Sequence, residues 1–275
     1  MMTGTAYREI RPSTGLRSFV DRLWIRRDRL RIGTVAVNRV LPDGCMDVIF
    51  NLGDPPLKDG EPDRSTSYVV GAMTRPLCVG LTGDVDMIAV RFRPGAAAAL
   101  LGIPADQLAD GTVELEACWG RTARDLECQI METAGTTGRA DLLERALLRR
   151  AEAAAAPSAA ITWAVRRILE TRGRVKVAEL ADRVGLGERQ LRRRFRSSVG
   201  LSPKTACRVA RFQGLLGQIR QTPAPNWGRL AWSAGYHDQA HLIREFRAFT
   251  GLTPTVYLAA CRGDRFVQDG AGPGD

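Results

Sequence analysis

Two related stretches decide the fold of the C-terminal part of the chain. Residues 180–203 read LADRVGLGERQLRRRFRSSVGLSP, and residues 230–254 read LAWSAGYHDQAHLIREFRAFTGLTP. Both contain a Leu-Ala pair, a glycine, a leucine and phenylalanine four residues apart, and a closing Gly-Leu-x-Pro. The offset is 50 residues at first and 51 after one insertion in the turn. A repeat of this length, with matched apolar and glycine positions, predicts a duplicated supersecondary unit.

Each copy has the pattern of a helix-turn-helix. A short helix is expected to end near Gly185 or Gly235, because glycine adopts the positive φ that ends a helix. The second helix then carries apolar residues on one face, at i, i+4, i+8 in the first copy and i, i+4, i+7 in the second. These residues are Leu191, Phe195 and Val199, and Leu242, Phe246 and Phe249.

Another face of the first copy carries four arginines, at i, i+3, i+4 and i+7. Neighbouring like charges on a helix repel by a few tenths of a kcal/mol per pair, and only Glu188 is close enough in sequence to offset this. A phosphate-lined groove would remove the repulsion, and arginine also pairs bidentately with guanine. We therefore predict DNA contact rather than a merely solvated face. The four residues are Arg189, Arg192, Arg193 and Arg196.

The equivalent face of the second copy is less basic. Exposed Ala240 and Ile243 would meet thymine methyl groups in a DNA groove, although Ile243 would also suit packing on a neighbouring helix. Gln239 and His241 flank this face and are candidates for base or phosphate contact. The stripe itself consists of Ala240, Ile243, Arg244 and Arg247.

A long helix is expected between the copies, over residues 203–220, with Val209, Phe212, Leu215, Leu216 and Ile219 on its apolar face. A rigid connection would fix the spacing of the two units. Successive major-groove segments on one side of B-DNA lie about 34 Å apart. One chain is therefore expected to occupy two adjacent segments.

The positive charge of the chain is confined to the same region. Residues 157–262 contain 19 Lys/Arg and 6 Asp/Glu, a net charge of +13, whereas the remaining residues contain 21 and 24, a net charge of −3. A basic excess in one segment indicates a polyanionic partner. A basic domain without such a partner is the alternative.

These C-terminal residues resemble the AraC/XylS family of transcription regulators. The similarity is carried by residues 235–247, GYHDQAHLIREFR, and residues 251–257, GLTPTVY, and it extends over about 157–262. It implies seven helices, with recognition helices at 188–198 and 238–249. It also implies base contacts at Arg189, Arg192 and Arg193, and then at Gln239, Ala240, His241, Ile243 and Arg244. The chain departs from the family at Leu258-Ala259, where an arginine often follows the final tyrosine, and at Ala240, whose side chain forms no hydrogen bond.

The N-terminal part reads as β-rich and then helical. Strands are expected at 35–41, 46–52, 68–71, 77–81 and 87–92, with an exposed loop at 57–67 and helices at 96–101, 121–134 and 139–155. The fold class is thus α+β: a β-barrel-like domain with following helices, and an all-α domain. We expect domains at 5–152 and 157–262 and a disordered tail at 263–275.

Residues 41–50, LPDGCMDVIF, and 90–95, VRFRPG, are similar to an uncharacterised sensor-like domain that precedes the DNA-binding part in a subgroup of these regulators. That resemblance implies a small barrel-like module without a known ligand. Asp43, Cys45 and Arg91 are the candidate effector-binding residues.

Catalytic and metal chemistry find little support in the sequence. The only histidines, His237 and His241, lie in the second copy of the repeat, and no H-E-x-x-H pattern is present. Cys45 lies between Asp43 and Asp47, an acidic setting that raises a thiol pKa and weakens a nucleophile. No phosphate-binding or dinucleotide-binding glycine motif occurs. We expect no enzyme activity, no cofactor and no metal.

The six cysteines form no C-x-x-C pair and are expected to be reduced. The 275 residues contain no apolar run of about 20 and no signal-peptide core, so a cytoplasmic protein without membrane contact is expected. Its expected partners are double-stranded DNA, a small-molecule effector, RNA polymerase and a second copy of the chain.

The leading hypothesis is a sequence-specific bacterial transcription regulator, activator or repressor, whose N-terminal domain senses a small molecule or mediates dimerisation. A second hypothesis is an N-terminal enzyme with a DNA-binding appendage, against which the missing histidines and nucleophile–base pairs argue. A third is a non-specific architectural DNA protein. The unequal recognition faces argue against it, because they suggest unequal half-sites.

Overall fold

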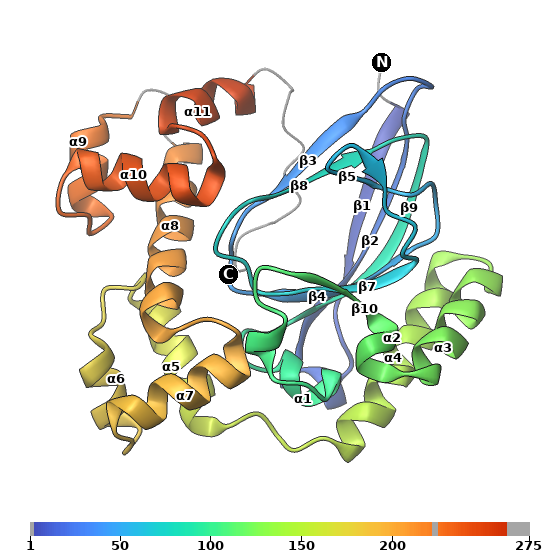
Figure 1. Ribbon diagram of the computed structural model, residues 1–275, viewed down its shortest axis with the longest axis horizontal. Helices are drawn as coiled ribbons and strands as arrows, with labels where there is room; N and C mark the ends of the chain where they lie inside the picture. Colours follow the sequence, from blue (N-terminus) through green and yellow to red (C-terminus); the bar gives the residue numbers. More distant parts are fainter. Residues whose placement is uncertain (1–2, 222–224, 263–275) are drawn as a thin grey trace.

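The computed structural model describes residues 3–221 and 225–262, which form a β-rich N-terminal part and a helical C-terminal part (Figure 1). The expected α+β class is confirmed. The predicted tail at 263–275 lies outside the described residues.

Two antiparallel sheets build the N-terminal part. The larger has six strands in the order β1-β2-β9-β4-β7-β10, and the smaller has four in the order β3-β8-β5-β6. Each described strand pairs only within its own sheet, and side chains of both sheets, such as Trp24 and Leu81, share a core. The sheets therefore form a sandwich, and "barrel-like" describes them only loosely. The strands are β1 (Thr3–Ile10), β2 (Val20–Arg29), β3 (Ala36–Val40), β4 (Met46–Asn51), β5 (Leu57–Lys58), β6 (Glu61–Pro62), β7 (Ser67–Val70), β8 (Leu77–Leu81), β9 (Asp84–Phe92) and β10 (Thr112–Glu114).

The stretch 57–67 contains a hairpin, so the prediction of a plain loop is wrong there. Its two strands, β5 and β6, are joined by Asp59 and Gly60, whose φ angles are 53° and 88°. Positive φ at both central residues is the requirement of a type I′ turn, which Asp-Gly favours. Leu57 pairs with Gly80 of β8 and so attaches the hairpin to the smaller sheet.

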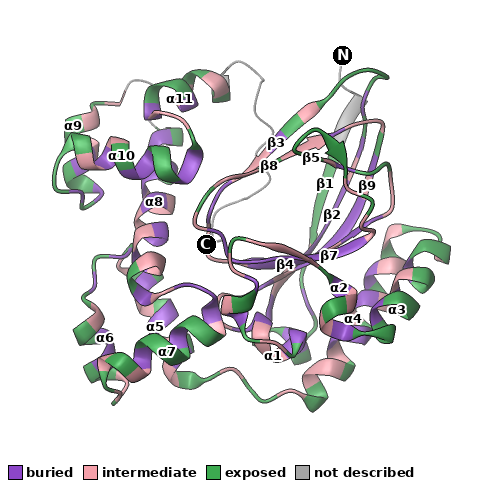
Figure 2. Ribbon diagram, viewed as in Figure 1, coloured by how far each residue is buried: buried purple, intermediate pink, exposed green. Residues whose placement is uncertain are grey.

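The larger sheet lies between the smaller sheet and a layer of helices. Along β2, Leu23 and Ile25 belong to the core beneath the helices, whereas Trp24 belongs to the core between the sheets, as strand alternation requires. Figure 2 shows β2, β4 and β7 buried, with exposed residues on the outer faces of the helices. The layer comprises α1 (Ala97–Leu101), α2 (Leu115–Trp119), α3 (Arg121–Glu132) and α4 (Thr136–Ala153), with 3-10 turns at Thr14–Leu16 and Ala105–Gln107.

Residues 157–262 form seven helices within their described portion, as the family resemblance implies. The two helix-turn-helix units are α6 with α7 and α9 with α10, and α8 joins them (Figure 1). Gly185 and Gly235 have φ of 67° and 80°, which confirms the predicted turns. The helices are α5 (Ala159–Glu170), α6 (Val177–Arg183), α7 (Glu188–Val199), α8 (Pro203–Gln221), α9 (Trp227–Ser233), α10 (Gln239–Thr250) and α11 (Pro254–Arg262).

The two parts share one apolar core. A single cluster of buried side chains runs from Leu100 and Leu101 of α1 to Val165 of α5 and Phe195 of α7. A methyl group at Gly95 would lie 3.4 Å from both Ile161 and Val199, so the turn before α1 packs closely on α5 and α7. The first helix-turn-helix unit is therefore docked on the N-terminal part.

Candidate nucleic-acid interface

Helix α7 presents the predicted arginine stripe to solvent. Its apolar residues Leu191, Phe195 and Val199 are buried, which fixes the rotation of the helix. All four stripe arginines are exposed, and the side chains of Arg192 and Arg196 are 57% and 65% exposed. The guanidiniums are therefore accessible to a ligand along the helix.

The stripe is only partly neutralised by protein carboxylates. Arg192 pairs with Glu188 one turn earlier, and Arg196 lies 3.6 Å from Asp106 of the N-terminal part. Within residues 3–221 and 225–262, no carboxylate lies within ion-pair distance of Arg189 or Arg193. Two cations without a carboxylate partner therefore leave this face of the helix positively charged.

Helix α10 begins with a side-chain cap. The Asp238 carboxylate accepts a hydrogen bond of 2.6 Å from the backbone N–H of His241, which satisfies one of the free donors of the first turn. This cap fixes the start of the helix, where Gln239 and Ala240 are exposed. Arg244 and Arg247 are exposed farther along.

Two predicted contact residues of α10 are half-buried. The His241 ring packs edge-on against Tyr236, with centroids 5.4 Å apart, and its Nε2 lies 3.7 Å from Glu245. Ile243 packs against the apolar core, the alternative that the sequence had left open. The exposed surface of this helix is therefore formed mainly by Gln239, Ala240 and the two arginines.

A buried ion pair attaches α10 to the joining helix. Glu245 is only 6% exposed, and its Oε2 accepts a hydrogen bond of 2.9 Å from Arg208 Nε of α8. Phe212 of α8 packs on Phe246 and Phe249 with ring centroids 5.5 Å and 5.0 Å apart. These contacts hold the second recognition helix at a fixed angle to α8.

Two residues near the arginine stripe were not predicted from the spacing of the arginines. Arg194 is exposed on another face of α7, outside the four-residue spacing that defines the stripe. Asp106 precedes Arg196 by 90 residues, so only the tertiary structure brings them together. The unbroken run of arginines at 192–194 could have indicated that Arg194 is also exposed on this helix.

In the N-terminal part, Arg91 joins two carboxylates. Its guanidinium lies 2.8 Å from Asp43 and 3.0 Å from Asp47, and Trp24 Nε1 donates a hydrogen bond of 2.9 Å to Asp47. Burial disfavours the charge of Arg91, but Asp47 and Asp43 outweigh burial and raise the pKa of Arg91 well above its ordinary value. The cluster is a largely buried network in which two carboxylates hold one guanidinium.

Of the three candidate effector residues, Arg91 lines a cavity between the sheets. This cavity of about 80 Å³ also contacts Trp24, Tyr68 and Asp47. Asp43 faces the junction with the helical part, where it lines a small crevice with Val165. The structure thus brings Asp43 and Arg91 together and places them between a cavity and the junction.

Cys45 accompanies this cluster without lining the cavity. Its backbone N–H donates a hydrogen bond of 2.8 Å to Asp43 Oδ1. Burial, followed by the charge of Asp43, raises the pKa of the Cys45 thiol well above its ordinary value. The thiol is therefore protonated at neutral pH and is a weak nucleophile.

The N-terminal part contacts the C-terminal ends of both recognition helices. A methyl group at Gly200, after α7, would lie 2.9 Å from Met46 and 3.0 Å from the carbonyl oxygen of Ala105. At the end of α10, Arg39 donates a hydrogen bond of 2.7 Å to the carbonyl oxygen of Thr250.

A further hydrogen bond, of 2.6 Å, runs from Gln213 Nε2 of α8 to the carbonyl oxygen of Pro42. Pro42 precedes Asp43 in the loop at residues 41–45, which we call the docking loop. Part of the sequence that carries the N-terminal resemblance, including Pro42 and Gly95, thus lies at the junction.

The described residues contain no group of three or more His, Cys, Asp or Glu side chains arranged to hold a metal ion. Among the helices of the described ranges, none is both long and apolar enough to cross a membrane.

Two family models match the chain. A family model described as "Helix-turn-helix domain" matches residues 180–260, and one described as "Domain of unknown function (DUF6597)" matches residues 8–114. A comparison with curated proteins gives no match.

Among solved structures, the chain is distantly similar to the ToxT protein of Vibrio cholerae and to the transcriptional regulator CdpR of Pseudomonas aeruginosa. One ToxT structure at 1.65 Å has 8% identity and a TM-score of 0.45, and the match covers 86% of this chain and 98% of ToxT. CdpR has 13% identity and a TM-score of 0.34, and the match covers 94% of this chain and 72% of CdpR.

The C-terminal match covers both copies of the repeat and the exposed arginine stripe of α7. The chain therefore carries an AraC-type helix-turn-helix DNA-binding domain behind a domain of unknown function.

Proposed function

We propose that the protein regulates transcription by reading two adjacent major-groove segments with α7 and α10, under the control of its N-terminal part. The observation that carries this proposal is the exposed stripe of Arg189, Arg192, Arg193 and Arg196 on the recognition helix of a helix-turn-helix. Arginine pairs bidentately with guanine and also neutralises phosphate, so this surface supplies both specificity and affinity.

The two recognition helices, α7 and α10, present unequal surfaces. Helix α7 carries four stripe arginines, whereas α10 offers Gln239, Ala240, Arg244 and Arg247, with His241 and Ile243 half-buried beside them. The first unit is therefore proposed to supply more of the affinity. Different faces also imply different half-sites, which favours specific regulation over architectural binding.

Salt dependence tests the DNA-binding proposal. The affinity of the full chain for a preferred duplex should fall as salt rises, with a log–log slope of about −0.9 per phosphate contact. The preference over random duplex should persist, because base contacts release no counterions. Gel-shift titrations at several salt concentrations measure both quantities. Loss of all sequence preference would identify the architectural alternative.

The N-terminal part is proposed to act on DNA binding through its contacts with α7, α8 and α10. A body that touches the ends of both recognition helices sets their separation and orientation. The effector response is assigned to the Arg91 cluster: Arg91 lines the inter-sheet cavity, and its partner Asp43 belongs to the docking loop. Cys45 is assigned a supporting place in that loop, through its hydrogen bond to Asp43.

The Asp106–Arg196 pair gives this control a direct test. Asp106→Asn should raise DNA affinity by about two- to fivefold, because a half-exposed ion pair that competes with phosphate contributes at most about 1 kcal/mol. Asp141→Asn is the matched control, because it removes the same charge from an exposed site on α4. Equal effects of the two substitutions, measured by fluorescence anisotropy with labelled duplex, would show that only net charge matters.

The remaining partners follow from the regulatory role. We place the protein in the cytoplasm with the bacterial DNA, and RNA polymerase and a second copy of the chain are its proposed protein partners. Edge strand β3 exposes Val37, and Val35 just before it is also exposed; both are about half exposed and offer an apolar edge to a second copy. The proposal assigns the chain no reaction to catalyse, which is consistent with the protonated Cys45 thiol.

A further inference from the structure

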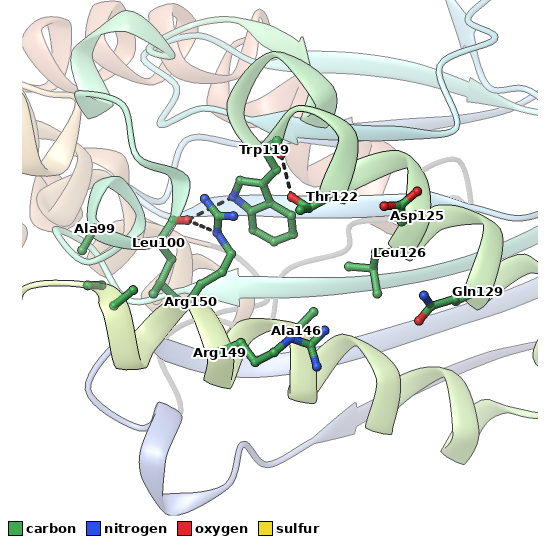
Figure 3. Close-up of a pocket in the computed structure, with 12 residues that line it drawn as sticks. Ala99, Leu100, Trp119, Thr122, Asp125, Leu126, Gln129, Ala146, Arg149 and Arg150 are labelled. Carbon is green, nitrogen blue, oxygen red and sulfur yellow. Dashed lines mark hydrogen bonds between the residues drawn. The ribbon is translucent and has the colours of Figure 1, made fainter.

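A groove of about 580 Å³ lies in the helical layer, on the other side of the larger sheet from the cavity that Arg91 lines. Helices α2 and α3 form one wall and α4 forms the other, with Leu100 of α1 at one end (Figure 3). This volume lies in the range of small-molecule sites, which are mostly apolar with a few placed polar groups.

One end of the groove holds an arginine in a fixed position. The guanidinium of Arg150 lies 4.5 Å from the centroid of the Trp119 ring. Arg150 Nε and Trp119 Nε1 both donate to the carbonyl oxygen of Leu100, at 2.7 Å and 3.0 Å (Figure 3). The head group is therefore oriented by the protein, and its two terminal nitrogens make no hydrogen bond or ion pair within the described ranges.

No carboxylate of the described residues lies within ion-pair distance of Arg150 or of the neighbouring Arg149. Burial lowers the pKa of Arg150, as expected for a partly desolvated cation that lacks a counter-ion. The Arg91 cluster is the opposite case, since two carboxylates already neutralise it. The arginine of the groove therefore lacks an anionic partner, whereas Arg91 already has two.

The rest of the lining narrows the chemistry of that anion. Leu126 and Ala146 provide an apolar floor, and Asp125 and Gln129 lie at the other end (Figure 3). The Asp125 carboxylate would repel a second negative group and would accept a hydrogen bond. A planar carboxylate matches the fork of a guanidinium better than a compact anion does.

We propose that this groove binds an apolar monocarboxylic acid, whose carboxylate pairs with Arg150 and whose body lies on Leu126 and Trp119. Ala153 and Ala154, which also line the groove, lead into the connection to α5, and α1 packs on α7. A ligand in this groove would contact both the connection between α4 and α5 and helix α1, which supports α7. Its identity as an effector rests on the proposed regulatory function, whereas its binding does not.

The test uses the full chain and three probe acids, benzoate, 4-phenylbutyrate and octanoate, in isothermal titration calorimetry. At least one is expected to bind with a Kd of about 1 mM or tighter, which is the affinity that a small ligand reaches with one anchored ion pair. The amide of that acid should bind about tenfold more weakly, because it loses the charge-assisted hydrogen bonds. Phenyl phosphate should also bind more weakly than the acids. Tighter binding of phenyl phosphate would overturn the carboxylate assignment.

Variants separate the groove from general charge effects. Arg150→Gln should weaken the bound acid by about tenfold, because it removes the charge that pairs with the carboxylate, and Asp125→Asn should strengthen it. Arg150 is half-buried and Asp125 is exposed, and circular dichroism of both variants checks that the fold is retained. Arg145→Gln is the matched control, because Arg145 is exposed on the same helix and lies outside the groove.

Absence of binding by all three acids, or equal binding by the Arg150 and Arg145 variants, would overturn the proposal. Gel shifts on the same preparations keep the two proposals apart. If no acid binds and DNA binding is intact, the groove proposal fails alone. If an acid binds and sequence preference for DNA is absent, the regulatory function fails alone.

Discussion

Replacing Arg193 with alanine is expected to weaken binding to the preferred DNA site by about 1–3 kcal/mol and to relax sequence preference at one position. Arg193 is exposed on the stripe and has no carboxylate partner among the described residues, so its guanidinium is available to DNA. The same change should leave the folding stability within about 0.5 kcal/mol of the wild type. Selection from random duplexes, followed by anisotropy titration, measures preference and affinity together.

Arg194→Ala is the matched control for this prediction. It removes the same charge from the same helix, at an exposed position outside the stripe. It should reduce affinity for preferred and random duplexes alike, because any remaining effect acts through phosphate. An unchanged sequence profile in the Arg193 variant would contradict the role assigned to the stripe.

Replacing Arg91 with methionine is expected to lower the free energy of unfolding by about 3–5 kcal/mol, because removal of one partner leaves uncompensated buried charge. Asp47 and Asp43, the carboxylates left behind, have side chains only 10% and 23% exposed. Urea unfolding followed by circular dichroism measures the change.

The control and the rescue for Arg91 separate charge from packing. Arg8→Met makes the same change at an exposed position and should alter stability by no more than about 0.5 kcal/mol. Adding Asp43→Asn and Asp47→Asn to the Arg91 variant should restore part of the stability, since no buried charge remains. If the triple variant is less stable than the single one, the charge network is not the main contribution of Arg91.

The helical part was largely predictable because its signals are local. The 3.6-residue period identified Leu191, Phe195 and Val199 as the buried face of α7, and that face leaves only one rotation for the arginine stripe. The repeat then predicted α9 and α10. In α10, however, the periodicity could not decide between groove contact and packing for Ile243, because that depends on the neighbouring helices.

The N-terminal part was less predictable for two physical reasons. Strands β1 and β2 carry charged residues that mask the alternation of apolar and polar side chains. In β2 these residues include Arg22 and Arg26, and Arg26 is only 1% exposed. The polar composition of 57–67 likewise hid the β5–β6 hairpin. Pairing partners, rather than local composition, define these strands.

The junction and the groove depend on long-range contacts. Arg39 and Thr250 are 211 residues apart in sequence, and Gln213 and Pro42 are 171 apart. The groove forms only when α4 packs beside α3. Such sites were beyond prediction from one sequence, because each half resembles an ordinary solvated surface.

The most direct test of the central claim is the selection of duplexes bound by the wild-type full chain from a random pool. Two unequal recognition helices joined by the rigid helix α8 predict an asymmetric DNA motif, with two blocks of preferred bases centred about 10–10.5 bp apart. The block read by α7 should be the one that relaxes in the Arg193 variant. A pool without an enriched motif, or a motif of two identical blocks, would contradict the account.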